Sequence, residues 1–222
     1  MLLALDTSTR TAGLALYDGV HVLSEVTWTS GEHHTVEVAP AVKTIVERAG
    51  LEMKDLKAVA VATGPGSFTG LRIGLAIAKG LALSLRLPVI GIPTLDALAV
   101  AQPVRDLSLA AVLQAGRGRL AVAWYHVENE AWQSYGKVEV LDIHALTRRI
   151  HTPTLVCGEL GEEERGILAR KYRNVSLASP AQSLRRAAFL AELAWQRWQA
   201  GQVDDPVTLA PIYLHIGEPI PA

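Results

Sequence analysis

A long, nearly uncharged segment after a glycine-rich loop limits the possible folds of this chain more than any other feature. The loop GPGSFTG covers residues 64–70, and the spacing of the apolar residues after it predicts a helix over residues 70–86. Between Arg72 and Arg86 the only charged residue is Lys79. Seven residues turn an α-helix to about 20° short of two full turns, so Arg72 and Lys79 share one narrow polar stripe. A helix that is apolar on nearly all other sides must be covered on nearly all of them.

A sheet of the same chain can cover only one side of this helix. The other side would lie against neighbouring helices of the same chain or against another subunit, and we favour the subunit. Gly70, Gly74 and Ala78 recur at a spacing of four and would leave a groove for a second backbone. The candidate interface combines this helix with the preceding predicted helix, 34–50, and comprises Leu71, Ile73, Gly74, Ile77, Ala78, Leu81, Val38, Val42 and Ile45.

The glycine loop itself does not match the two common phosphate-binding motifs. A Walker loop needs four residues between its glycines and then a lysine, but five residues separate Gly64 and Gly70, and Leu71 follows. The dinucleotide fingerprint GxGxxG fails at its third glycine, where Thr69 stands, and no acidic residue follows at about 20 positions. We therefore interpret Gly64, Gly66 and Gly70 as a structural turn.

Apolar segments and turn signals alternate in the same order twice along the chain, as three strands, a helix, a strand and a helix. This order predicts an α/β fold with two domains, each a mixed sheet flanked by helices. The domains are expected at 1–103 and 104–222, the second with a final helix at 183–200 and an extended tail. In the first, strands are predicted at 2–6, 12–19, 20–28, 57–64 and 87–92, and a short helix at 94–102. In the second, strands are predicted at 107–114, 119–127, 131–141, 152–158 and 174–178, and a helix at 142–150.

The charge balance weakens the case for direct nucleic-acid binding. Lysine and arginine number 21 against 22 for aspartate and glutamate, a net charge of −1, so the whole chain is not drawn to phosphate. Cys157, in an apolar strand, is the only cysteine, which excludes an internal disulfide and a cysteine-based zinc cluster. The first residues have no basic segment and soon reach an aspartate, so we expect a cytoplasmic chain with no membrane association.

Three other groups of residues could carry chemistry. Asp6, Thr7 and Ser8 end the first predicted strand and could meet a metal-bound phosphate, although such residues also bond their own backbone in turns. This weak nucleotide-binding hypothesis stays open. The adjacent histidines of EHHT (32–35) point about 100° apart on a helix and do not predict a metal site. QAGRGRLAVAWY (114–125) has two arginines that could contact RNA or simply lie on a solvated turn.

The segment GPGSFTGLRIGLAIAKGLALSLRLPVIGIPTLDALA (64–99), with LALDTST near the start and PIYLH (211–215) near the end, resembles the bacterial TsaB/YeaZ family. That family supplies subunits of the machinery that makes threonylcarbamoyladenosine (t6A) in tRNA. The resemblance implies two actin-like domains of the ASKHA or ribonuclease H-like kind. It also implies pairing with the catalytic subunit TsaD and, through it, with the ATPase TsaE, a homodimer when alone, and contact with tRNA only through the complex.

The resemblance further implies a non-catalytic subunit without a metal or a bound cofactor, ATP and ADP included. TsaD holds its metal on the histidines of an HxxxH motif, and the equivalent positions here are Thr94 and Leu98, neither of which can replace an imidazole ligand. The hairpin at 114–120 departs from the family pattern, because Gln114 and Leu120 stand where relatives carry acidic or polar residues. The alternative is a chain that acts by itself, as an actin-like nucleotide hydrolase or a glycoprotease-like peptidase.

Overall fold

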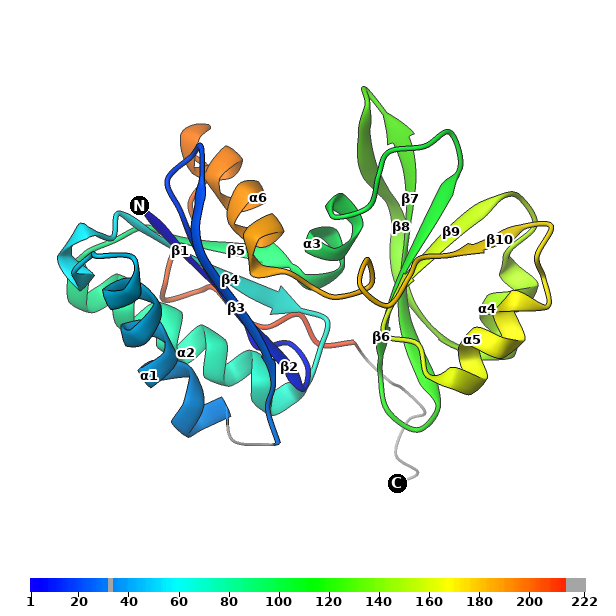
Figure 1. Cartoon of the computed structure of the whole chain (residues 1–222), viewed down its shortest axis with the longest axis horizontal. Helices are drawn as coiled ribbons and strands as arrows, with labels where there is room; N and C mark the ends of the chain where they lie inside the picture. Colours follow the sequence, from blue (N-terminus) through cyan, green and yellow to red (C-terminus); the bar gives the residue numbers. More distant parts are fainter. Residues whose placement is uncertain (32–33, 215–222) are drawn as a thin grey trace.

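The computed structural model describes residues 1–31 and 34–214 and contains two five-stranded mixed sheets with the same strand order (Figure 1). In each sheet the first strand is central, antiparallel to the second and parallel to the fourth. The duplication predicted from the order of elements is confirmed. The first sheet, β3–β2–β1–β4–β5, contains β1 (Leu2–Asp6), β2 (Thr11–Tyr17), β3 (Val22–Thr29), β4 (Ala58–Gly64) and β5 (Val89–Pro93). The second, β10–β9–β6–β7–β8, contains β6 (Ser108–Gln114), β7 (Arg119–Glu128), β8 (Ala131–Asp142), β9 (Thr154–Gly158) and β10 (Val175–Leu177).

Helices cover the outer faces of the two sheets at opposite ends of the molecule (Figure 1). On the first sheet these are α1 (His34–Arg48) and α2 (Phe68–Leu85), and a short 3-10 turn, η1 (Met53–Asp55), lies between them in sequence. On the second sheet they are α4 (Ile143–Arg149) and α5 (Glu162–Ala169). The alternating buried residues of β1 to β4 fill the space between the first sheet and its helices, so α1 and α2 belong to that core.

The two remaining helices lie between the sheets, and each packs against a different sheet from the one predicted. Helix α3 (Thr94–Val100) follows the first sheet in sequence, yet Leu95 and Leu98 are buried with β6, β7 and β9 of the second. Helix α6 (Ala187–Gln199) was expected in the second domain, yet Leu190 and Ala191 are buried against β1, β4 and β5 of the first. The predicted assignment of helix 183–200 to the second domain is therefore wrong.

The predicted beginning of the final helix is also wrong. The helix was predicted from residue 183, but α6 begins at Ala187. The residues before it are held by long-range polar contacts: Arg186 Nε donates to Glu25 Oε2 at 2.9 Å, and the Ala188 backbone N–H donates to Glu25 Oε1 at 3.0 Å. Glu25, which lies on β3, therefore caps the N-terminus of α6.

The glycine loop fits closely against the β1–β2 loop of the same chain. A Cβ atom on Gly66 would collide with the carbonyl oxygen of Ser8, and one on Gly70 would collide with that of Thr7. Gly64 adopts a φ of +114°, which favours glycine. The groove predicted along Gly70 and Gly74 for a partner's backbone is thus filled by the chain's own Thr7.

Candidate functional site

The side of α2 that faces away from the first sheet is a row of small and apolar residues, all exposed except the half-buried Ile73. We call this row the outer stripe; it consists of Thr69, Ile73, Ala76, Gly80 and Leu83. Leu83 is 64% exposed, and no atom lies within 4 Å of the place where a Cβ on Gly80 would be. Successive residues of the stripe are three or four positions apart, the spacing at which one helix packs along another.

Helix α2 is less covered within the chain than its composition predicts. Only 33% of its residues are buried, although it is the one helix among the described residues that is long and apolar enough to cross a bilayer. Its covered side packs on β4. At one edge of the exposed side, Arg72 Nε donates to the Tyr213 hydroxyl at 2.9 Å and stacks on Phe68, with 3.7 Å between Cζ and the ring centroid. The outer stripe itself has no cover in the described chain.

Six of the nine predicted interface residues are buried in the first domain and cannot touch a partner. Helix α2 places three of them on the sheet side and α1 places the other three there: Leu71, Gly74, Ala78, Val38, Val42 and Ile45. The other three, Ile73, Ile77 and Leu81, are half-buried along the edges of the exposed side. The prediction missed Ala76, Gly80 and Leu83. They lie opposite Leu71 and Leu75 on the helix, so they would have been identified as exposed if the side of α2 that faces the sheet had been known.

Asp6, Thr7 and Ser8 lie close together at the end of β1, but each side chain already has partners within the chain. Thr7 Oγ1 donates to the Gly70 carbonyl at 2.8 Å, and Asp6 Oδ1 accepts the Ser8 backbone N–H at 2.8 Å. The Ser8 and Thr94 hydroxyls are 2.8 Å apart. These three side chains thus bond within the chain, as turn residues do, and the nucleotide-binding hypothesis stays a prediction.

The second carboxylate oxygen of Asp6 accepts from Arg185, which joins the two halves of the molecule. Arg185 Nε lies 2.9 Å from Asp6 Oδ2, its NH2 group lies 2.7 Å from Thr9 Oγ1, and its NH1 group bonds Glu159, which follows β9. Burial by itself lowers the pKa of Arg185, but the charges of Asp6 and Glu159 outweigh it and raise that pKa. The guanidinium thus stays charged between two carboxylates of different sheets. No local pattern in the sequence pointed to it.

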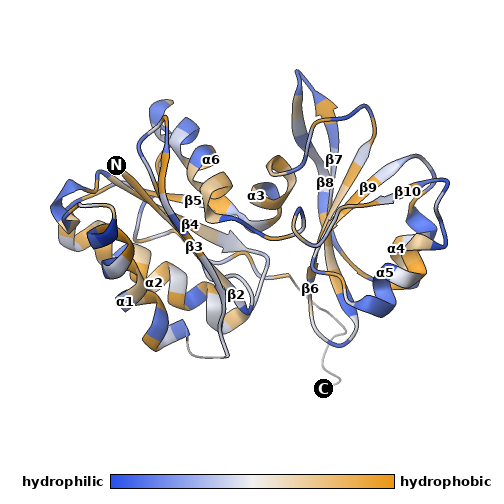
Figure 2. Ribbon diagram, viewed as in Figure 1, coloured by the Kyte–Doolittle hydropathy of each residue, from blue (hydrophilic) through white to orange (hydrophobic). Residues whose placement is uncertain are grey.

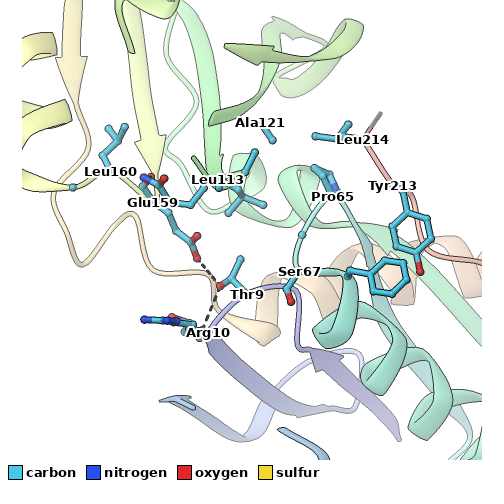
Figure 3. Close-up of a pocket in the computed structure, with 17 residues that line it drawn as sticks. Thr9, Arg10, Pro65, Ser67, Leu113, Ala121, Glu159, Leu160, Tyr213 and Leu214 are labelled. Carbon is cyan, nitrogen blue, oxygen red and sulfur yellow. Dashed lines mark hydrogen bonds between the residues drawn. The ribbon is translucent and has the colours of Figure 1, made fainter. Parts of the chain in front are cut away.

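A cavity of about 1200 Å³ lies between the sheets beside this ion cluster (Figure 3). Figure 3 shows Pro65 and Ser67 of the glycine loop on one side and Leu113 and Leu160 of the second domain on the other. Glu159 accepts the Thr9 hydroxyl at 2.6 Å at its floor. Asp6, Thr7 and Ser8 do not line the cavity, so the predicted residues do not place a phosphate there.

The positions that match the metal ligands of TsaD are used by the fold. Thr94 is buried, and its hydroxyl accepts the Gly64 backbone N–H at 3.1 Å. Leu98 is fully buried in the core of the second sheet. His34 is also buried, with Nε2 2.9 Å from the Thr9 carbonyl oxygen, while residues 32 and 33 of EHHT and His215 of PIYLH lie outside the described residues. Within the described part of the chain, no three His, Cys, Asp or Glu residues are grouped as a metal site.

Two further predicted features can be located. Cys157 is buried in β9, as predicted, and burial raises the pKa of its thiol to about 12. Gln114 lies at the cavity and donates from Nε2 to Glu164 Oε2 at 2.8 Å, so it ties the 114–120 hairpin to α5. Arg117, at the tip of that hairpin, is exposed.

Comparisons with known proteins agree with this architecture. Residues 21–178 match the family model described as "TsaD: tRNA N6-adenosine threonylcarbamoyltransferase". The tRNA threonylcarbamoyladenosine biosynthesis protein TsaB of Bacillus subtilis (strain 168) is 35% identical over 128 residues, which make up 58% of this chain and 56% of the relative. The chain spans about half the length of the curated relatives that it matches.

Solved structures extend the similarity over nearly the whole chain. YeaZ from Pseudomonas aeruginosa superposes with a TM-score of 0.79 at 26% identity, over 96% of this chain and 99% of that one. The ROK hexokinase of Thermus thermophilus, at a TM-score of 0.51 and 13% identity over 90% of this chain and 99% of that one, shares the fold alone. The two mixed sheets are thus an actin-like pair of the ASKHA kind. The chain belongs to the TsaB/YeaZ family, and its residues 21–178 carry the domain that the TsaD family model describes.

Proposed function

We propose that this chain is a non-catalytic subunit that pairs with a TsaD-like catalytic subunit, and through it with a TsaE-like ATPase, for threonylcarbamoyl transfer to adenosine in tRNA. Family membership supports the pathway, since the relatives are named for tRNA threonylcarbamoyladenosine biosynthesis. The cytoplasmic location expected from the sequence is part of the same proposal. The observation that supports pairing with another subunit is the outer stripe, an apolar helix face that is exposed to solvent in the isolated chain.

The geometry of the stripe suits another helix. Ala76 and Gly80 are four residues apart and exposed, so a second backbone can come close between Ile73 and Leu83. In the absence of a catalytic subunit, the same row can pair with a second copy of this chain about a twofold axis, which buries one patch against itself. We therefore propose a homodimer for the isolated chain and a heterodimer when the catalytic subunit is present.

The alternatives have less support. A nucleotide hydrolase would need its polar groups turned toward the cavity, whereas Asp6, Thr7 and Ser8 are bonded inside the chain. The position of Thr94, which would hold a metal ligand in the catalytic relative, carries a buried hydroxyl that supports the glycine loop. These contacts favour a chain that has kept the fold of its catalytic relative and acts through its surface, as a binding subunit.

The test is co-elution of this chain with its cognate TsaD-family subunit in size-exclusion chromatography with light scattering. Ala76→Glu and Leu83→Glu should each abolish the heterodimer, because each places a charge on the stripe, and should leave the free chain folded, because both positions are exposed. Ile77 is a poorer choice since its side chain also packs on the first core. Val20→Glu, at a 77% exposed apolar position on the β2–β3 turn, is the matched control. Heterodimers that survive both stripe variants would overturn the proposed interface.

A further inference from the structure

Basic side chains gather where α4 and α5 end, in a chain whose net charge is −1. Helix α4 carries Arg148 and Arg149 in its last turn. After Glu164, no aspartate or glutamate occurs until Glu192, and this interval contains Arg165, Arg170, Lys171, Arg173, Arg185 and Arg186. The charge of the chain is therefore distributed unevenly, although its sum is close to zero.

The fold brings the end of α4 and the turn after α5 together. Lys171 Nζ donates to the Ile150 carbonyl at 2.6 Å and also to the Thr147 carbonyl. Asn174 Nδ2 donates to the His151 carbonyl at 3.0 Å. The turn at 170–174 is thereby fixed against the end of α4, next to the segment that carries Arg148.

Some of these basic side chains are bonded to other groups of the chain, and others are not. Lys171 is held by the backbone carbonyls, and Arg149 bonds Glu139 at 2.9 Å. Arg148, Arg170 and Arg173 are exposed and form no salt bridge within the described residues. Three exposed guanidinium groups thus lie on two segments that the fold holds together.

An exposed aromatic residue lies among them. Tyr172, between Arg170 and Arg173 in the turn, is 74% exposed. Positive residues at helix C-termini are expected, because they offset the helix dipole. The helix dipole explains why Arg148 and Arg170 lie at the ends of helices. It does not explain Arg173 or the exposed ring of Tyr172, which both follow α5. Guanidinium groups that can bond phosphate oxygens, set around an exposed ring that can stack on a base, are the combination that single-stranded nucleic acid requires.

We propose that Arg148, Arg170, Tyr172 and Arg173, the basic turn, contact the RNA substrate, with the arginines on phosphates and Tyr172 on an unpaired base. This inference rests on the proposed function, which supplies a tRNA as the ligand. Figure 1 shows α4 and α5 at the opposite end of the molecule from α1 and α2, so a partner on the outer stripe leaves the basic turn open. Figure 2 shows hydrophilic residues along α5, where Glu162, Glu163 and Glu164 occupy the first turn and the cations follow at the other end of the helix. Three cations are too few to retain RNA alone, so the contact adds to those of the catalytic subunit.

The experiment measures tRNA binding by the complex of this chain with its TsaD-family subunit, by fluorescence anisotropy at several salt concentrations. The triple variant Arg148→Gln, Arg170→Gln, Arg173→Gln should weaken binding about tenfold or more and reduce the slope of log K against log salt by about 2 to 3, since each lost phosphate contact removes a share of the released counterions. The matched control neutralises three exposed cations elsewhere, Lys54, Lys57 and Arg105, in the same way.

A second pair of variants separates the aromatic contact from charge. Tyr172→Ala should weaken binding with little change of the salt slope, and Tyr172→Phe should bind as the unaltered complex does, because the ring that stacks is kept. Co-elution of this chain with its TsaD-family subunit tests the proposed function separately. If no heterodimer forms, the proposed function fails, whatever the basic turn does. Equal binding and equal slope for the basic-turn and control triples overturn the inference, as does an unaltered heterodimer without measurable tRNA affinity.

Discussion

Arg185 donates a hydrogen bond from Nε to Asp6 Oδ2 at 2.9 Å, and both side chains are almost completely buried between the two sheets. Asp6 ends β1 of the first sheet, while Glu159, which also bonds Arg185, follows β9 of the second. One guanidinium therefore bonds two carboxylates from opposite sides of the domain boundary. It also bonds the Thr11 carbonyl at 3.0 Å, so most of its donors have acceptors.

Replacing Arg185 with methionine should lower the free energy of unfolding by about 3–5 kcal/mol, because the change leaves the buried Asp6 carboxylate without its cation. Urea titration followed by circular dichroism measures this difference. Arg186→Met removes the neighbouring pair with Glu25, whose arginine is half exposed, and should cost about 1 kcal/mol or less. Adding Asp6→Asn and Glu159→Gln to Arg185→Met should return part of the stability. Equal losses for the Arg185 and Arg186 variants would contradict this role.

Two glycines of α2 should respond to alanine in opposite directions. Gly70→Ala places a methyl group against the Thr7 carbonyl oxygen, a backbone atom that cannot turn aside, so we expect a loss of about 1–3 kcal/mol. Gly80→Ala meets no atom within 4 Å and should gain up to about 1 kcal/mol from the helix propensity of alanine. Both are measured by urea unfolding at a concentration at which the chain is monomeric. A gain at Gly70 would contradict its contact with Thr7, and a loss at Gly80 would contradict the open space around it.

The order of strands and helices could be predicted because it depends on local patterns. Apolar runs, the Asp18–Gly19 turn and the stop at Gly50 all act within a few residues of their own position, and β2, β3 and α1 follow them. The sheet on which α3 or α6 packs could not be predicted in this way. That choice depends on which face of each sheet remains uncovered once the other helices are in place, and those faces are built from residues far apart in sequence.

The sequence pattern identified α2 as the candidate interface helix, but it did not identify which side of α2 is exposed. Helix α2 is apolar nearly all round, so its pattern does not tell which side meets the sheet, and six buried residues, Leu71 and Val38 among them, were assigned to the partner. The pairing of Arg185 with Asp6 joins positions far apart in the chain, beyond the reach of any spacing rule. That the outer stripe binds a partner stays a prediction.

A partly buried carboxyl group at the boundary between α3 and β7 gives a test of pH dependence. The Tyr125 hydroxyl donates to Asp96 Oδ1 at 2.7 Å. Burial raises the pKa of Asp96 above its ordinary value, and the bond from Tyr125 opposes this only in part. Between the ordinary and the raised pKa, the folded chain binds more protons at Asp96 than the unfolded chain does. Asp96 therefore makes the free energy of unfolding fall as the pH rises through this window.

Asp96→Asn keeps an oxygen acceptor for Tyr125 and removes the titration. The variant should gain stability relative to the native chain as the pH rises above about 4, and the gain should level off once Asp96 is ionised in both states. Urea titrations at a series of pH values give this difference directly. A difference for Asp96→Asn that falls with pH would mean that Asp96 is stabilised as a carboxylate in the fold, because only then would the native chain gain stability on ionisation.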